Sequence, residues 1–276
     1  MLKFFRMYSA FIKQQIKTLI EYKVDFLLGF IALGVSQIST FLIILAVFTQ
    51  IKSIATYSFD EVLLFFGYSQ IIRGIDHIYN DNIWVTAWNK VRDGSFSNYL
   101  IRPINVITHI IMERFQFDGF GEVVIGLIIF FYAKAKVGLV LGFSGSVTLV
   151  FFILCGLAIY FAIKLATCAV SFWTVSSGEF MSVIYEVNTF TKFPLDIYKN
   201  FFLKNLLIYL LPFAIVSYFP IAYFLRDSSF LKSVLGFDYH YKEFMIVFIG
   251  VVSALFLSFS FMIWNIGVKR YNATGS

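Results

Sequence analysis

The sequence predicts an all-α integral membrane protein. Three observations lead to this prediction: 59% of the residues are hydrophobic, only 14% are charged, and the mean hydropathy is +0.82. A typical soluble domain has about 45–50% apolar and about 25% charged residues, so this chain has too little polar surface to cover a water-exposed core. The low proline content and the absence of low-complexity tracts argue against a disordered or fibrous chain.

The first 23 residues predict an amphipathic helix that lies on the membrane surface. Apolar side chains recur at helical spacing from Phe4 to Ile20, and lysines and an arginine occupy the positions between them. A basic helix of this kind binds in the headgroup plane with its apolar face in the acyl boundary. The alternative is a solvated extension of the first membrane span, which would leave the phenylalanine stripe in water.

Apolar stretches long enough for a hydrocarbon core of about 30 Å predict the membrane spans. Four of them precede residue 174, and one lies near the C-terminal end. The predicted spans cover residues 24–47, 62–79, 117–133, 146–173 and 244–268. The segment between 80 and 114 is rich in charged residues and is predicted to be a water-exposed loop.

The region between residues 174 and 243 allows two topologies. Ser176 and Glu179 have the spacing of a capping box, which predicts the start of a new helix. In one topology, 179–194 is a span and 195–225 is a proline-broken hairpin on the outer side. In the other, 204–225 is the span and a cytoplasmic linker precedes it. Both have six spans with both termini inside, and the excess of lysine and arginine inside is larger for the second.

No chemical motif for catalysis, cofactor binding or metal binding is present. The stretch from Gly29 to Ser36 lacks the lysine of a phosphate-binding loop and lies inside the first predicted span. The histidines show no metal-ligand spacing, and the cysteines lie in apolar sequence, which favours buried thiols: His77, His109, His240, Cys155 and Cys168. We therefore expect a chain that is no enzyme by itself, with no catalytic, cofactor or metal site and no nucleic-acid partner.

Ionisable residues in predicted spans are candidate functional groups, because each costs about 2.5–3.5 kcal/mol at the centre of a membrane helix. Arg73, Asp76 and His77 share a helix face near the inner end of the second span, and we call them the inner polar cluster. Two interpretations fit this cluster: it gates a pathway, or it pairs with itself at the interface. A proton-coupled transporter would need carboxylates midway through the membrane, and Glu122 lies too near the end of the third span for that role. Lys164 in the fourth span is expected to reach the inner headgroups or to pair with a carboxylate of another helix.

The loop from 80 to 114 contains the most distinctive local pattern. Residues 91–103 combine a glycine-centred turn, a short amphipathic stretch and an Arg-Pro step, and we call this segment the elbow. An apolar ridge flanked by arginines is suited to docking into a groove of another protein. The predicted docking residues are Arg92, Asp93, Gly94, Phe96, Tyr99, Leu100, Arg102 and Pro103.

The elbow resembles the coupling helix of the permease subunits of type 2 ATP-binding-cassette exporters, which lies between their second and third spans. The resemblance extends over nearly the whole chain and includes the interfacial helix and the six spans. Four residues resemble the outer re-entrant region that precedes the last span in this family: Pro194, Pro212, Phe213 and Pro220. The resemblance therefore favours the topology with the outer hairpin over the one favoured by counting cations.

This choice gives one transmembrane domain over residues 1–276 with seven parts. They are the interfacial connecting helix 1–23, spans 1 and 2 in 24–79, the cytoplasmic coupling loop 80–115, spans 3 to 5 in 116–194, the outer re-entrant region and loop 195–243, span 6 in 244–268 and the tail 269–276.

The resemblance also implies partners and a mechanism. ATP and Mg²⁺ are expected on a separate ATPase subunit that docks on the elbow, and a second permease, identical or related, completes the transporter in the plasma membrane. Alternating access would then export an amphipathic or hydrophobic substrate such as a drug, lipid or peptide. Aromatic residues that would suit the pathway, or simply pack, are Phe41, Phe48, Phe65, Phe66 and Trp173. An ion-coupled secondary transporter and a membrane assembly factor without transport activity remain the alternatives.

Overall fold

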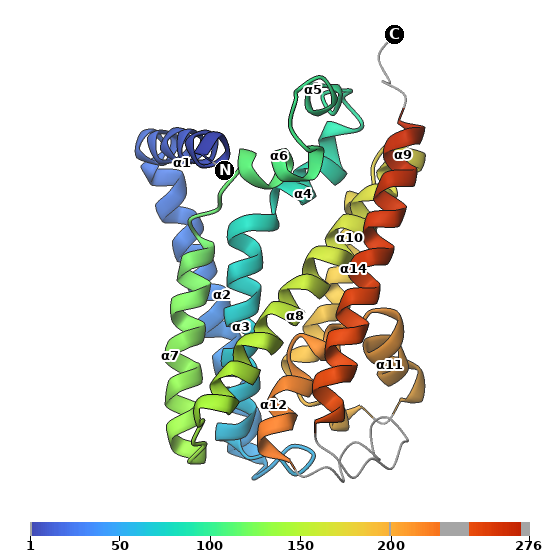
Figure 1. Ribbon diagram of the computed structural model, residues 1–276. Helices are drawn as coiled ribbons and strands as arrows, with labels where there is room; N and C mark the ends of the chain where they lie inside the picture. Colours follow the sequence, from blue (N-terminus) through green and yellow to red (C-terminus); the bar gives the residue numbers. More distant parts are fainter. Residues whose placement is uncertain (1, 199, 227–242, 272–276) are drawn as a thin grey trace.

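The long apolar runs form long helices that extend between two ends of the molecule (Figure 1). The computed structural model describes residues 2–198, 200–226 and 243–271, and within them the ordered elements are helical, apart from an isolated bridge between Ile54 and Tyr57. The predicted all-α class is confirmed. The long helices are α2 (Lys23–Gln50), α3 (Phe59–Asn80), α7 (Gly119–Val137), α8 (Phe143–Ala169) and α14 (Phe244–Arg270).

Short helices gather at one end of this bundle, which we call the elbow end. It contains α1 (Leu2–Glu21), which lies across the start of α2, and the residues that follow α3 (Figure 1). Those residues form α4 (Asn82–Val85), η1 (Thr86–Lys90), α5 (Ser97–Leu100) and α6 (Val106–Glu113). Tyr271, after the last helix, is at the same end, because its hydroxyl contacts the elbow. The first and the last described residues therefore both lie on the side of the predicted coupling loop.

Three helical stretches are long and apolar enough to cross a membrane: Leu27–Gln50, Phe143–Thr174 and Phe244–Arg270. The last of these stretches includes α14, and the second includes α8 and α9 (Ser171–Thr174). Helices α3 and α7 coincide with the predicted second and third spans but contain more charged residues than those three stretches. Their charged residues include Arg73, Asp76, Glu122, Lys134 and Lys136.

Four glycines form the contact between α3 and α7. A Cβ atom added to Gly67 would lie 2.6 Å from the backbone nitrogen of Phe130, and one added to Gly126 would lie 2.8 Å from that of Ile71. Gly74 and Gly119 approach each other in the same way, seven residues (two helical turns) further along each helix. Glycines let two helix backbones come this close, and in a membrane such contacts replace the hydrophobic effect as the source of association.

The region between 178 and 225 departs from regular helix. Helix α10 (Gly178–Asn188) and the turn η2 (Thr189–Lys192) cover the predicted fifth span, but the 11 residues of α10 extend only about 16 Å. Short elements follow, and prolines lie at or near the start of three of them: Pro194 precedes η3, Pro212 precedes η5, and Pro220 lies in the first turn of α12. These elements are η3 (Leu195–Ile197), α11 (Phe201–Asn205), η4 (Leu206–Leu210), η5 (Phe213–Ile215) and α12 (Tyr218–Leu225).

The expected capping box at the start of α10 is wrong. Ser177 is the N-cap residue and its side chain makes no cap hydrogen bond. The Ser176 hydroxyl instead donates to the carbonyl oxygens of Ala87 and Trp88, 3.3 Å from each, so it ties α10 to the loop after α3. A capping box does form at the start of α3, between Ser58 and Glu61.

The apolar core lies where the proline-broken segment packs on α3 and α8. Phe65, Phe66, Phe152, Phe213 and Phe219 are fully buried there. Burial of the first two favours their interpretation as packing residues over pathway residues. Phe41 and Phe48 contact the same core from α2, whereas Trp173 is half exposed at the elbow end.

A polar network closes the opposite end of the molecule, where residues 51–58 meet the proline-broken segment. The Asp196 carboxylate accepts hydrogen bonds from the hydroxyls of Tyr218 (2.7 Å) and Tyr57 (3.3 Å). Arg226 lies over the Tyr57 ring, 4.1 Å from its centroid, and donates to both oxygens of Thr56. We call these five residues the Asp196 network. Of the predicted outer region, residues 227–242 and Lys199 lie outside the described residues, as do 272–276 of the tail.

Replacing the central carboxylate should loosen this end of the fold. Asp196→Ala leaves two largely buried tyrosine hydroxyls without their acceptor, a loss worth about 1–3 kcal/mol. We expect a lower apparent melting temperature in detergent, with a smaller decrease for Tyr57→Phe, which removes only one donor. Equal stability of Asp196→Ala and the wild type would contradict this role.

Candidate functional site

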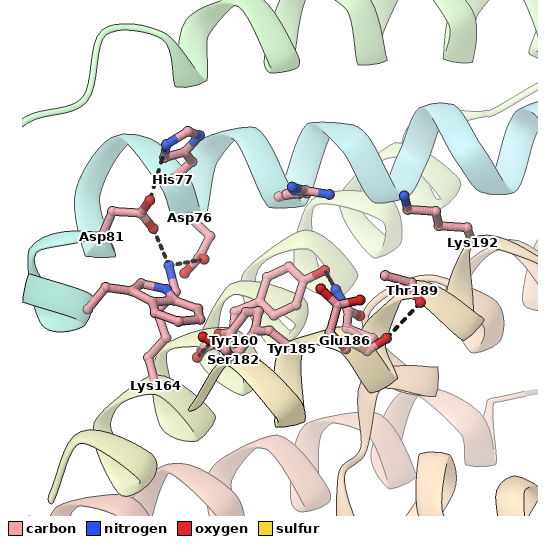
Figure 2. Close-up of a pocket in the computed structure, with 13 residues that line it drawn as sticks. Asp76, His77, Asp81, Tyr160, Lys164, Ser182, Tyr185, Glu186, Thr189 and Lys192 are labelled. Atoms are coloured by element: carbon pink, nitrogen blue, oxygen red, sulfur yellow. Dashed lines mark hydrogen bonds and ion pairs between the residues drawn. The ribbon is translucent and has the colours of Figure 1, made fainter. Parts of the chain in front are cut away.

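A charged cavity of about 290 Å³ lies between α3, α8 and α10 (Figure 2). Its walls combine charged side chains of all three helices with the aromatic rings of Trp84, Tyr160 and Tyr185. Tyr185 packs against both other rings, with centroids 5.3 Å and 6.0 Å away. The cavity therefore has a mixed ionic and aromatic lining inside an otherwise apolar bundle.

One wall of the cavity is a buried ion pair. The Lys164 ammonium lies 2.6 Å from a carboxylate oxygen of Asp76 and 2.6 Å from one of Asp81 (Figure 2). Lys164 and Asp76 are 1% and 3% exposed. Asp76 also accepts a hydrogen bond from Asn80, one turn further along α3. Because charges cannot be buried in isolation, the two helices α3 and α8 are held in register by this pair.

A second buried carboxylate joins α7 to the other side of α3. Glu122 is 1% exposed and lies 3.7 Å from the Arg73 guanidinium and 3.7 Å from the His77 ring. His77 also contacts Asp81, at 3.1 Å. The inner polar cluster therefore does not pair with itself: Asp76 contacts α8, and Arg73 and His77 contact α7. Lys164 pairs with a carboxylate of another helix, which was one of its two expected roles, and Glu122 is the partner on α7.

Glycine and an aspartate shape the elbow turn. Gly94 has φ +75°, a left-handed conformation that other residues rarely adopt. The Asp93 carboxylate accepts hydrogen bonds from the amide and the hydroxyl of Ser95. These bonds keep the pKa of Asp93 below its usual value, so this exposed side chain is ionised. The turn leads directly into the short helix α5, which carries the predicted apolar ridge.

Phe96 is the anchor of the elbow rather than a docking residue. Its ring is fully buried and packs edge-on against Phe172 at 4.9 Å, Tyr271 at 5.0 Å and Trp264 at 6.0 Å. The Tyr271 hydroxyl donates to the carbonyl oxygen of Gly94 and contacts the Ser97 hydroxyl. We call these rings the aromatic socket; it joins the elbow to the end of α14.

The predicted apolar ridge is thus corrected in one respect. Phe96 and Tyr99 face inward, because tertiary contacts to later parts of the chain hold them, and neither ring is available to a partner. The exposed elbow surface consists of Arg92, Asp93, Asn98, Leu100, Ile101, Arg102 and Pro103. Ile101, which was not among the predicted docking residues, is 79% exposed and is its most prominent apolar side chain.

A polar network supports the base of the elbow from α6. Glu113 accepts hydrogen bonds from Tyr99 and Asn82 and lies 3.7 Å from the Lys90 ammonium. Burial raises the pKa of Glu113, but these partners outweigh it and the net pKa lies below its usual value. Burial together with the positive charge of Arg102 lowers the pKa of His109, whose ring nitrogen lies 2.9 Å from that guanidinium.

The sequence did not point to several residues of the cavity. Asp81, Glu186 and Lys192 line it, and so do the aromatic rings named above. Asp81 had been placed in the cytoplasmic loop, and α10 had no predicted partner. A signal was available in the opposite charges of Asp76 and Lys164, which lie in the second and fourth predicted spans. No group of three or more metal-ligating side chains occurs in the part of the chain that the structure describes.

Comparison with known proteins gave one match. A family model described as "ABC-2 family transporter protein" matches residues 35–275. No curated protein and no solved structure matches the chain. The matched range includes the charged cavity, the elbow and the Asp196 network.

Proposed function

Because the chain belongs to the ABC-2 family of transporter proteins and is thus a membrane permease subunit of an ABC transporter, we propose that it forms the transmembrane part of an ATP-driven exporter. ATP and Mg²⁺ bind to a separate ATPase subunit in this proposal. A second permease, identical or related, completes the pathway in the plasma membrane. The exported substrate is amphipathic or hydrophobic, as a drug, lipid or peptide is.

The observation that carries the proposal is the elbow. Its outer surface presents Leu100 and Ile101 between Arg92 and Arg102, whereas its inner surface is fixed by the aromatic socket. A rigid apolar knob with charged flanks is the arrangement expected where a membrane subunit docks on a soluble partner. The knob occupies the end of the molecule that also carries α1 and the end of α14, which is cytoplasmic in this proposal (Figure 1).

In this proposal the chain crosses the membrane six times, and each helical segment has a particular role. Helix α1 is the interfacial helix, the five long helices are spans, α10 together with η2 forms a short fifth span in chain order, and residues 195–225 are the outer re-entrant region. Support comes from the position of the proline-broken elements, which pack at the end opposite to the elbow and into the core (Figure 1). Alternating access requires that ATP binding favours one of two permease arrangements, and the elbow is where that preference would be transmitted.

A second candidate function is favoured by one observation. Proton- or ion-coupled transporters need carboxylates inside the membrane, and Asp76 and Glu122 are buried within the bundle. In such a transporter these groups would exchange protons, and no ATPase partner would be needed. The two functions therefore differ in whether hydrolysis accompanies the purified permease.

The test is native mass spectrometry of the gently solubilised complex, with ATP hydrolysis measured on the same sample. We expect a soluble ATPase in a fixed ratio to the permease and vanadate-sensitive turnover. Ile101→Asp should reduce the amount of retained ATPase at least tenfold, because it puts a charge on the apolar knob.

The matched control is Val140→Asp, which places the same charge on an 89% exposed side chain between α7 and α8, at the opposite end. This variant should keep the ATPase and its turnover. A permease that purifies without an ATPase, or equal retention by the two variants, would contradict the exporter proposal and favour the ion-coupled alternative.

A further inference from the structure

In the proposed six-span arrangement, the charged cavity lies at a depth where a protein surface normally meets lipid tails. Arg73 is seven residues before the end of α3, about 10 Å along the helix, and Glu186 is eight residues after the start of α10, about 12 Å. The Arg73 side chain is nevertheless 46% exposed, and Glu186 is exposed as well. Charged groups at this depth face water or a polar ligand rather than hydrocarbon.

On one side of the cavity, the charged side chains are already paired with one another. The Lys164 ammonium is bound by Asp76 and Asp81, and Asp81 also contacts His77. These groups are hydrogen-bonded to one another and form a wall. They have little capacity left for a ligand.

The other half of the cavity contains charges with unused hydrogen-bonding capacity. Within the described residues, the side chains of Lys192 and Glu186 form no ion pair or hydrogen bond, and Arg73 has only the 3.7 Å contact with Glu122. Lys192 and Arg73 can together donate several hydrogen bonds to an anionic group. Glu186 can accept from a cationic one.

The balance of charge selects the kind of ligand. Among the residues that line the cavity, the carboxylates of Asp76, Asp81 and Glu186 face three permanent cations (Arg73, Lys164 and Lys192) and one histidine. The set is close to neutral, so a ligand with a net charge would add an unbalanced charge to a site of low dielectric. A zwitterion satisfies both kinds of unused group without changing the balance.

The mouth of the cavity offers a place for an apolar chain. Val183 and Phe190 lie one turn on either side of Glu186 and are 65% and 43% exposed. A headgroup in the cavity would thus leave its tail against apolar side chains of α10 and η2. Figure 2 shows Glu186, Thr189 and Lys192 along this side of the cavity.

We propose that the cavity binds the headgroup of a zwitterionic amphiphile, with its anionic group on Lys192 and Arg73 and its ammonium on Glu186. This inference rests on the proposed export function, since it names the substrate class of that pathway. The wall formed by Lys164 and the two aspartates positions α3 and α8 around the headgroup.

The experiment measures binding to the purified permease in a neutral maltoside detergent. The probe is lysophosphatidylethanolamine with a fluorophore on its acyl chain, and the competitors share one chain length. They are unlabelled lysophosphatidylethanolamine (zwitterionic), lysophosphatidylglycerol (anionic), an alkyltrimethylammonium (cationic) and a monoacylglycerol (uncharged). We expect the zwitterion to compete at least tenfold better than the others.

Variants test the assigned contacts. Lys192→Gln should weaken binding of the probe at least tenfold, and Lys192→Arg should retain it. Glu186→Gln should weaken binding of the zwitterion more than binding of the anion. The matched control is Lys204→Gln on α11, which does not line the cavity and should bind as the wild type does. Comparable elution of all four variants in size exclusion shows that they fold.

Several results would overturn the assignment. They are equal competition by the monoacylglycerol, tighter binding of the anion or the cation, and unchanged binding by Lys192→Gln. Disulfide cross-linking of Glu186→Cys to a second copy would show instead that this face is a subunit interface. Binding needs no ATPase, so the headgroup site can fail while the complex with the ATPase is retained, and the reverse outcome is also distinguishable.

Discussion

Lys164→Met should destabilise the folded chain by about 3–5 kcal/mol, because it leaves the Asp76 carboxylate buried without its cation. Methionine matches the length of the lysine stem, so the change removes the charge with little loss of packing. The expected result is a large decrease in apparent melting temperature and in the amount of monodisperse protein, both measured by size exclusion after heating in detergent.

A paired variant separates the lost charge from a general effect of substitution. In Lys164→Met with Asp76→Asn, the buried unpaired carboxylate is gone, and the new amide can still bond with Asn80. Asp81 also loses the lysine, but it is partly exposed and keeps its contact with His77. We expect this double variant to recover most of the lost stability, although Asp76→Asn alone should also be destabilised. If the single and double variants were equally unstable, the ion pair would not be the reason for the effect.

Gly126→Leu should separate α3 from α7. Even the first carbon of a side chain at this position would lie 2.8 Å from the backbone nitrogen of Ile71 and 3.0 Å from the carbonyl oxygen of Gly67. A backbone cannot move aside as a flexible side chain can. The loss of folding stability should therefore exceed the value of about 1–3 kcal/mol that is typical of overpacking. We expect loss of the monodisperse peak in size exclusion.

Gly34→Leu is the matched control, since a Cβ at Gly34 on α2 meets no atom within 4 Å. Both changes add the same side chain to a glycine in an apolar helix, so any difference reports the close helix contact. A normal yield of Gly126→Leu would mean that α3 and α7 are not held together by the glycines.

The helices that follow from local sequence are those with long uninterrupted apolar runs. The first span was predicted over 24–47 and α2 covers Lys23–Gln50, and the last was predicted over 244–268 and α14 covers Phe244–Arg270. Such runs are visible from the sequence because helix formation in a membrane depends on local apolarity. The short elements between 189 and 225 have no comparable signal, because their bounds depend on prolines and on packing against the core.

Contacts between distant residues explain what sequence reasoning missed at the site. The side of α5 that faces inward is decided by Phe172, Trp264 and Tyr271, which no pattern around Phe96 can reveal. The partners of the inner polar cluster lie on α7 and α8 for the same reason. One signal was available: Gly67 and Gly74 repeat after seven residues, as Gly119 and Gly126 do, and this spacing places each pair on one helix face.

The Asp196 network also sets an order for the biosynthesis of the chain. Its hydrogen bonds join Tyr57 to Asp196 across 139 positions and Thr56 to Arg226 across 170. The turn that follows α2 is therefore synthesised long before the residues that fix it. Such distant pairing pays a loop-closure cost before it stabilises anything. The first two long helices must enter the membrane with that turn still unpaired. A nascent chain shorter than 196 residues lacks the Asp196 carboxylate, and one shorter than 226 residues lacks the Arg226 contacts with Thr56.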